Sequence, residues 1–139
     1  MLIWSGSESA CERGVGMLLS ERAKKALIGY NTLRDRIISA RFRGQPFNIT
    51  VIQVYAPTAD SSDPDIDDFY AQLGESIDRI HSQDIRFVIG DWNAKVGQDR
   101  TNCAHVRGKQ GYGKRNERGE RLIEFASVSC LLHMQHMQH

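Results

Sequence analysis

Two apolar stretches of the chain predict strands that end in polar side chains. The run at 86–90 is short and apolar, as in a buried strand, and it leads directly into Asp91 and Asn93. The run at 49–55 is rich in β-branched residues and ends at Tyr55, just before a proline that cannot donate to a ladder. Strand side chains alternate between faces, so a strand that continued through Asn93 would present Asp91 and Asn93 side by side. Ligand sites of open α/β sheets lie at the carboxyl ends of strands, and we expect a site here.

Further elements follow from the spacing of apolar residues. We expect a strand at 14–19, and a strand at 37–42 that forms a hairpin with 49–55 through a turn at 43–46. Asp63, followed by Pro64 and several acids, is expected to cap a helix. That helix would turn one apolar face to the sheet, made of Ile66, Phe69, Tyr70, Leu73, Ile77 and Ile80. Asn116 is expected to cap a last amphipathic helix that begins at Glu117.

Composition is that of a single soluble domain. The 139 residues are 40% hydrophobic and 25% charged, and the net charge of +1 excludes a global basic field. Cys11, Cys103 and Cys130 form no CxxC pair, which argues against a disulfide framework or a zinc site and favours a reducing, intracellular setting. No apolar stretch approaches the roughly 20 residues that cross a bilayer, so we expect no membrane association. The sequence leaves the oligomeric state open.

The two strand-end motifs resemble a known superfamily. Val54-Tyr55-Ala56-Pro57 and Gly90-Asp91-Trp92-Asn93-Ala94 are similar to the endonuclease/exonuclease/phosphatase superfamily, the metal-dependent phosphoesterases with a DNase I-like fold. Residues 113–122, GKRNERGERL, resemble the endonuclease domain of RTE-type LINE retrotransposons and the related craniofacial development protein 2-like proteins. Residues 4–6, 14–16 and 35–38 look similar to the same group, in the same order. The resemblance implies an α/β fold, a partial DNase I-like two-sheet sandwich flanked by helices, over residues 1–130, followed by a low-complexity His/Met/Gln tail at 131–139.

The chemistry that this resemblance implies is hydrolysis of a phosphodiester by water with Mg²⁺ or Mn²⁺. Asp91 would orient or deprotonate the attacking water, or help to hold the metal. Asn93 would support Asp91, as a second metal ligand or as a donor to a phosphate oxygen, and Tyr55 would donate its hydroxyl to the phosphate. The plainer alternatives are an Asx turn for the Gly-Asp-x-Asn sequence and a half-buried strand residue for Tyr55.

A local excess of positive charge lies in the last third of the chain. Seven lysines and arginines stand between Arg100 and Arg121 against two glutamates, which predicts contact with a nucleic-acid backbone. Lys114, Arg115 and Asn116 are the preferred candidates because they lie in the retrotransposon-like motif. DNA is therefore the expected partner, and the nucleus the expected location. A solvated loop and helix face would explain the same charges.

Two motifs of the superfamily are not found here. Its members carry an asparagine and then a metal-binding glutamate near the first strand, and an Asp-His pair near the end. We therefore expect a domain truncated at both ends, with impaired hydrolysis. One alternative is an inactive remnant that binds nucleic acid or protein, and another is an esterase acting on a phosphoinositide or other small phosphate ester. The histidines of the tail, His133, His136 and His139, favour a misread or truncated reading frame over a metal site.

Overall fold

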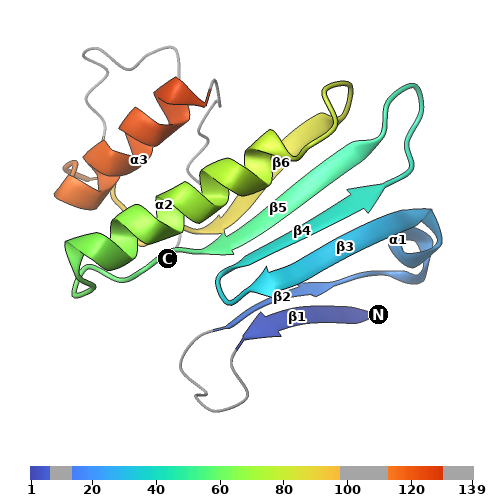
Figure 1. The fold of residues 1–139 in the computed structure, drawn as a ribbon, viewed down its shortest axis with the longest axis horizontal. Coiled ribbons are helices and arrows are strands. Elements are labelled where there is room, and N and C mark those ends of the chain that lie inside the picture. The colour runs from blue at the N-terminus through green and yellow to red at the C-terminus, as the bar shows by residue number, and fades with distance from the viewer. Residues whose placement is uncertain (7–13, 98–112, 130–139) are drawn as a thin grey trace. The chain divides into compact units, whose positions relative to one another are not determined.

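The computed structural model describes residues 1–6, 14–97 and 113–129, which form a mixed α/β structure (Figure 1). The chain folds into two compact units. The first unit comprises Met1–Pro57 and Ser62–Asp91, and the second comprises Thr58–Ser61 and the chain from Trp92 onward. The elements in order are β1 (Leu2–Gly6), β2 (Gly14–Leu18), α1 (Glu21–Ala26), β3 (Leu27–Arg34), β4 (Ile37–Phe42), β5 (Ile49–Tyr55), α2 (Asp63–Asp78), β6 (Ile85–Asp91) and α3 (Glu117–Val128). The predicted α/β class is confirmed, with two sheets in the first unit. None of the described helices combines the length and the apolar character that a membrane span requires.

The larger sheet holds four strands in the order β3-β4-β5-β6. The predicted hairpin between β4 and β5 is confirmed, with Ile37 opposite Val54 and Phe42 opposite Ile49. β6 pairs with β5 in parallel, so the chain must cross the sheet between them, and α2 makes this crossover. The carboxyl ends of β5 and β6 therefore meet at one edge of the sheet.

A two-stranded sheet of β1 and β2 covers one face of the larger sheet. Alternate residues of these strands point inward and are buried with Ile38 and Ala40 of β4. The Ser5 hydroxyl also reaches across to β3, where its one O–H lies between the carbonyl oxygens of Thr32 and Arg34 as hydrogen-bond acceptors. The buried side chains that β1, β2 and the residue after β2 contribute are Ile3, Ser5, Val15, Met17 and Leu19.

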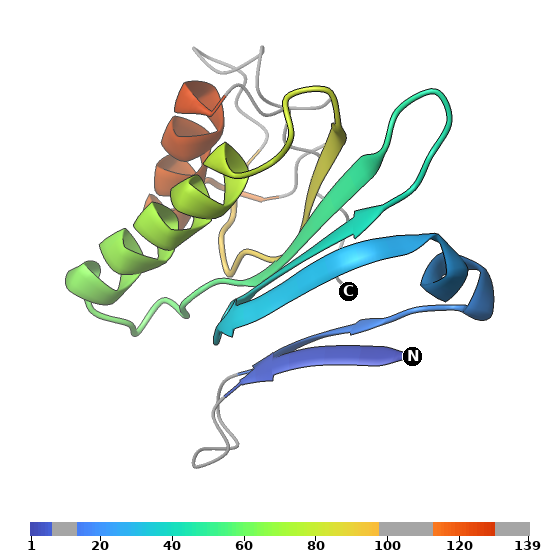
Figure 2. The same ribbon diagram turned by 45° about the vertical axis from the view of Figure 1, so that its right-hand side comes forward.

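Helix α2 runs along the four-stranded sheet, as Figures 1 and 2 show. By strand alternation, Ile37, Ile52 and Val54 face away from β1 and β2, and all three are buried. The predicted apolar face of α2 is confirmed, since its five members within the helix and Ile80 just beyond are buried. The cap was predicted one residue too late: the Ser62 hydroxyl, not Asp63, accepts the first-turn N–H, that of Asp65. Ser62 is the N-cap because it has the extended backbone conformation directly before the first turn.

The prediction of a buried strand at 86–90 is wrong, because no residue of β6 is buried and only Val88 and Asp91 are partly covered. Ile85, Phe87 and Ile89 are 44%, 50% and 47% exposed. The extensive contacts of the two-stranded sheet are with β3, β4 and β5, and most of β6 stays exposed. An apolar run identifies a strand, but it does not show how many layers cover it.

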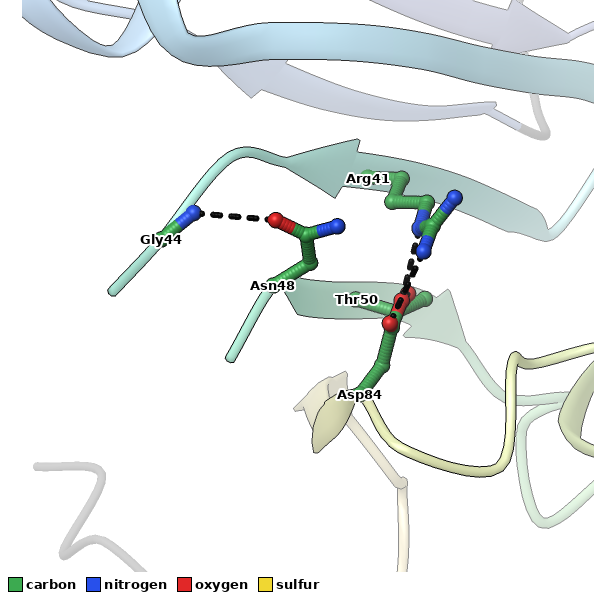
Figure 3. A network of polar contacts seen from close by, with 5 residues as sticks. All are labelled: Arg41, Gly44, Asn48, Thr50 and Asp84. Carbon is green, nitrogen blue, oxygen red and sulfur yellow. Dashed lines mark hydrogen bonds and ion pairs between the residues drawn. The ribbon is translucent and has the colours of Figure 1, made fainter. Parts of the chain in front are cut away.

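An ion pair between Arg41 and Asp84 lies at the opposite end of the sheet, where the crossover connection leads into β6 (Figure 3). Asp84, just before β6, accepts two hydrogen bonds from the Arg41 guanidinium, from Nε at 2.8 Å and from Nη2 at 3.0 Å. The Thr50 hydroxyl donates a third at 2.8 Å. Because Arg41 lies on β4 and Thr50 on β5, this carboxylate joins the loop after α2 to two strands. The Asp84 side chain is only 3% exposed, so its charge depends on these partners.

Candidate functional site

Tyr55 and Asp91 lie at the carboxyl ends of two neighbouring parallel strands. Their Cα atoms are partners in the register of β5 and β6, and the Ala56 N–H donates to the Asp91 carbonyl at 2.8 Å. In-register residues of adjacent strands project to the same face, so the phenol and the carboxylate stand side by side. Both are partly exposed. Both positions were expected at strand ends, whereas the pairing of Tyr55 with Asp91 follows from the register of β5 and β6.

Arg36 holds Tyr55 from the turn between β3 and β4. The Tyr55 N–H donates to the Arg36 carbonyl at 2.9 Å, and Nη1 of Arg36 donates to the Tyr55 carbonyl at 3.1 Å. The guanidinium carbon also lies 5.4 Å from the centre of the Tyr55 ring, which is cation–π range. No sequence pattern places Arg36 against this ring, because the contact depends on how the β3–β4 turn meets the end of β5. Arg36 adds a fixed positive charge to this edge.

Asn93 is not on the strand. β6 ends at Asp91, and Asn93 has a φ of +47°, the left-handed region that asparagine enters more readily than most residues. The alternation argument that would place Asn93 beside Asp91 therefore does not apply. Asn93 belongs to the second unit, and its role in a site stays a prediction.

Gly90 fixes the backbone that leads into Asp91. Its φ is +143°, and a Cβ atom at this position would lie 2.0 Å from the Val54 carbonyl oxygen. No other residue fits without a backbone shift. The Gly-Asp sequence is thus a structural requirement for placing Asp91 opposite Tyr55.

Asn116 has a structural role in the second unit. Its side-chain oxygen accepts from the Gly119 N–H at 2.8 Å, the expected cap of α3, and from the Lys95 N–H at 3.0 Å. The Asn116 N–H donates in return to the Lys95 carbonyl at 3.0 Å. Gly119 allows this close approach, since a Cβ there would lie 1.9 Å from the same carbonyl oxygen. The amide that was predicted to bind nucleic acid thus joins α3 to the segment at Lys95.

The basic side chains near α3 differ in how many hydrogen bonds and ion pairs they make within the protein. Arg115 is 20% exposed, donates from Nε to the Val96 carbonyl at 3.1 Å, and lies 3.8 Å from a carboxylate oxygen of Glu120. Arg118 donates to the Ser61 carbonyl at 3.1 Å. Lys114 is exposed, with no hydrogen bond or ion pair to the described residues. Lys114 is therefore the better placed of the predicted contacts, while the predicted cations Arg100, Arg107 and Lys109 lie outside the described residues.

Removal of the Asn116 cap is expected to destabilise the second unit. Asn116→Ala loses the acceptor for two backbone donors, and we expect a loss of about 1–2 kcal/mol in the free energy of unfolding. Asn116→Asp keeps the acceptor and should remain close to the original stability. Urea denaturation followed by circular dichroism measures both. Equal destabilisation by the two substitutions would contradict a role based on the side-chain oxygen.

The described residues do not form a metal centre by themselves. Within 1–6, 14–97 and 113–129, no three His, Cys, Asp or Glu side chains gather as a group that could hold a metal ion. The strand ends offer one carboxylate, that of Asp91. One carboxylate with phosphate oxygens and water is a common way to hold Mg²⁺ in phosphoryl-transfer sites. The donor chemistry therefore fits a metal that binds together with a phosphate group, and not a site made by these residues alone.

Comparison with known proteins identifies relatives over nearly the whole chain. No protein-family model matches it. Craniofacial development protein 2 of Bos taurus is 43% identical over 131 residues, which are 94% of this chain and 22% of the relative. The protein of the same name from Tragulus javanicus is 41% identical over the same shares of both chains. The chain thus spans about a fifth of the length of the curated relatives that it matches, and it is homologous to part of craniofacial development protein 2.

Proposed function

We propose that this chain corresponds to part of a metal-dependent phosphodiesterase domain of the retrotransposon endonuclease type, with DNA as its substrate and the nucleus as its location. The observation that carries the proposal is the pairing of Tyr55 with Asp91 at the carboxyl ends of β5 and β6. Homology to part of craniofacial development protein 2 supports it, because residues 113–122 resemble the endonuclease domain of RTE-type retrotransposons and the proteins related to it.

Each group at this edge has a chemical task in the proposal. The Tyr55 hydroxyl donates to a non-bridging phosphate oxygen, and the contacts of Arg36 fix the position of its ring. The Asp91 carboxylate accepts a proton or hydrogen bond from the attacking water. Asn93 supplies an amide donor to the phosphate. A bound Mg²⁺ or Mn²⁺, held in part by Asp91, would neutralise charge on the phosphate oxygens.

Slow hydrolysis is the expected behaviour. A single carboxylate is a weak anchor for Mg²⁺, which keeps most of its water and takes the remaining ligands from the substrate. We therefore expect nicking of supercoiled DNA to require millimolar metal and excess protein.

The test is nicking of a supercoiled plasmid with added Mg²⁺ or Mn²⁺. We expect Asp91→Ala to lower the rate at least about 100-fold, the usual cost of removing an essential acid or base. Tyr55→Phe should have a smaller effect, because it removes one hydrogen-bond donor and keeps the ring. A rate that is unchanged in Asp91→Ala would contradict the proposal. EDTA controls exclude metal-independent contaminants.

A second candidate function is binding without hydrolysis. It is favoured by the exposed Lys114 and by the excess of positive charge between Arg100 and Arg121. If the folded chain binds DNA in EDTA, and neither it nor Asp91→Ala nicks the plasmid in metal, this candidate replaces the first. Binding through phosphate neutralisation would weaken steeply with salt.

A further inference from the structure

The segment that carries Asn93 is held by the start of α3. Asn93 has a φ of +47°, and two residues later Lys95 exchanges hydrogen bonds with Asn116, the N-cap of α3. The Asn116 side-chain oxygen accepts from the Lys95 N–H, and the Asn116 N–H donates to the Lys95 carbonyl, each at 3.0 Å. The Val96 carbonyl accepts from Nε of Arg115, and the Val96 side chain is fully buried. The backbone that follows Asn93 is therefore fixed on α3.

The same turn of α3 also holds the segment that follows β5. Nη2 of Arg118 donates to the Ser61 carbonyl at 3.1 Å and lies 3.4 Å from the Ala59 carbonyl oxygen. The Ser61 N–H donates to the Thr58 carbonyl at 3.0 Å, so these residues form a turn against the guanidinium. Both segments belong to the second unit, although one follows β5 and the other follows β6. Within that unit, α3 joins the two segments.

From these contacts we propose that Asn116 and Arg118 are positioning residues for Asn93. The inference rests on the proposed function, in which the Asn93 amide donates to the phosphate. Asn116 acts through the backbone of Lys95, and Arg118 anchors the same turn of α3 on the segment after β5. In this role neither side chain contacts DNA. A group displaced by about 1 Å slows a reaction strongly. Removal of either side chain therefore slows the chemical step without weakening DNA binding.

A direct contact with DNA would have a different signature. A cation that neutralises a phosphate contributes to the affinity and to its dependence on salt. Arg118 directs its guanidinium to backbone carbonyls, whereas the exposed Lys114 makes no hydrogen bond or ion pair with the described residues. These two cations belong to one sequence motif, so they form a matched pair for the test.

The test measures single-turnover nicking of supercoiled plasmid over a range of concentrations of the full chain. We expect Asn116→Ala and Arg118→Gln each to lower the maximal rate about tenfold or more and to leave the half-saturating protein concentration unchanged. Asn116→Asp keeps the acceptor oxygen and should recover most of the rate. Lys114→Gln should instead raise the half-saturating concentration and reduce the slope of log affinity against log salt by about one.

An Asn93→Ala background separates positioning from general destabilisation. In this background Asn116→Ala and Arg118→Gln should lower the rate no further, because the group that they position is absent. An equal loss of rate with and without the Asn93 side chain would overturn the inference. A weaker affinity with a smaller salt slope in Arg118→Gln would do the same, because Arg118 would then contact DNA.

Hydrogen exchange tests the contact of Asn116 independently of activity. In Asn116→Ala the Lys95 amide should exchange at least about tenfold faster than in the original chain, whereas Lys114→Gln should leave its exchange unchanged. Unchanged exchange in Asn116→Ala would contradict the inference. If the original chain does not nick DNA, the proposed function itself fails. If Asn116→Ala and Arg118→Gln nick DNA at the full rate, only the positioning role fails.

Discussion

Gly90→Ala is expected to destabilise the first unit by about 3 kcal/mol or more. Two effects add at this position. The φ of +143° is strained for any side chain, and the new Cβ atom would lie 2.0 Å from the Val54 carbonyl oxygen, so the backbone must move. The movement would separate β6 from β5 where Tyr55 and Asp91 meet. Urea denaturation followed by circular dichroism measures the loss.

Two other glycines serve as matched controls. Gly29→Ala in β3 places a Cβ with no heavy atom within 4 Å and without a positive φ, so its effect should be close to zero. Gly113→Ala has a φ of +71° and equally open surroundings, so it reports the cost of the backbone conformation alone, about 1 kcal/mol. If Gly90→Ala lowers the free energy of unfolding no more than Gly113→Ala does, the close contact with Val54 does not contribute to the destabilisation.

Asp84→Asn is expected to lower the free energy of unfolding of the first unit at neutral pH. It should also reduce the loss of this free energy as the pH falls. The hydrogen bonds from Arg41 hold the pKa of Asp84 below its usual value of 3.8, against the opposing effect of burial, and the Thr50 hydroxyl lowers the pKa further. A carboxyl group with a lowered pKa in the folded state stabilises fully above its unfolded pKa. This contribution is lost as the pH falls through the folded value.

The measurement is the urea midpoint of the original chain and of Asp84→Asn from about pH 6 to about pH 2.5. The difference between the two should be largest at pH 6 and should shrink steadily below about pH 4. Glu75→Gln is the control, because it breaks the exposed ion pair with Arg34, and such pairs contribute about 1 kcal/mol or less. A difference between the original chain and Asp84→Asn that does not vary with pH would contradict the role of the Asp84 charge.

Strong local patterns explain which elements the sequence predicts. β5 has a continuous β-branched run, α2 has a full apolar face, and α3 begins at an asparagine cap, so each element was predicted with nearly its observed bounds. β3 was not predicted, because its sequence LIGYNTLR mixes apolar and polar residues without clear alternation. α1 was also missed, although Ser20 followed by Glu21 is a capping signal, because six residues are too few to show a helical period.

The candidate site shows the same limit. Tyr55 and Asp91 could be placed at strand ends from the sequence, since each follows an apolar run. Their meeting required β6 to lie parallel to β5, which periodicity alone cannot specify. The contact of Arg36 with the Tyr55 ring and the positive φ of Asn93 arise from tertiary geometry, and no local pattern encodes them.

The crossover through α2 has a consequence for the order of folding. β3, β4 and β5 are joined by short turns, so their antiparallel pairs form with little loss of loop entropy. β6 is separated from β5 by residues 56–84, which include α2. The parallel pair of β5 and β6 therefore forms late in folding, after α2 has packed on the sheet. We therefore expect a kinetic hierarchy in which the edge that carries Tyr55 and Asp91 is assembled last during refolding and is lost first during unfolding.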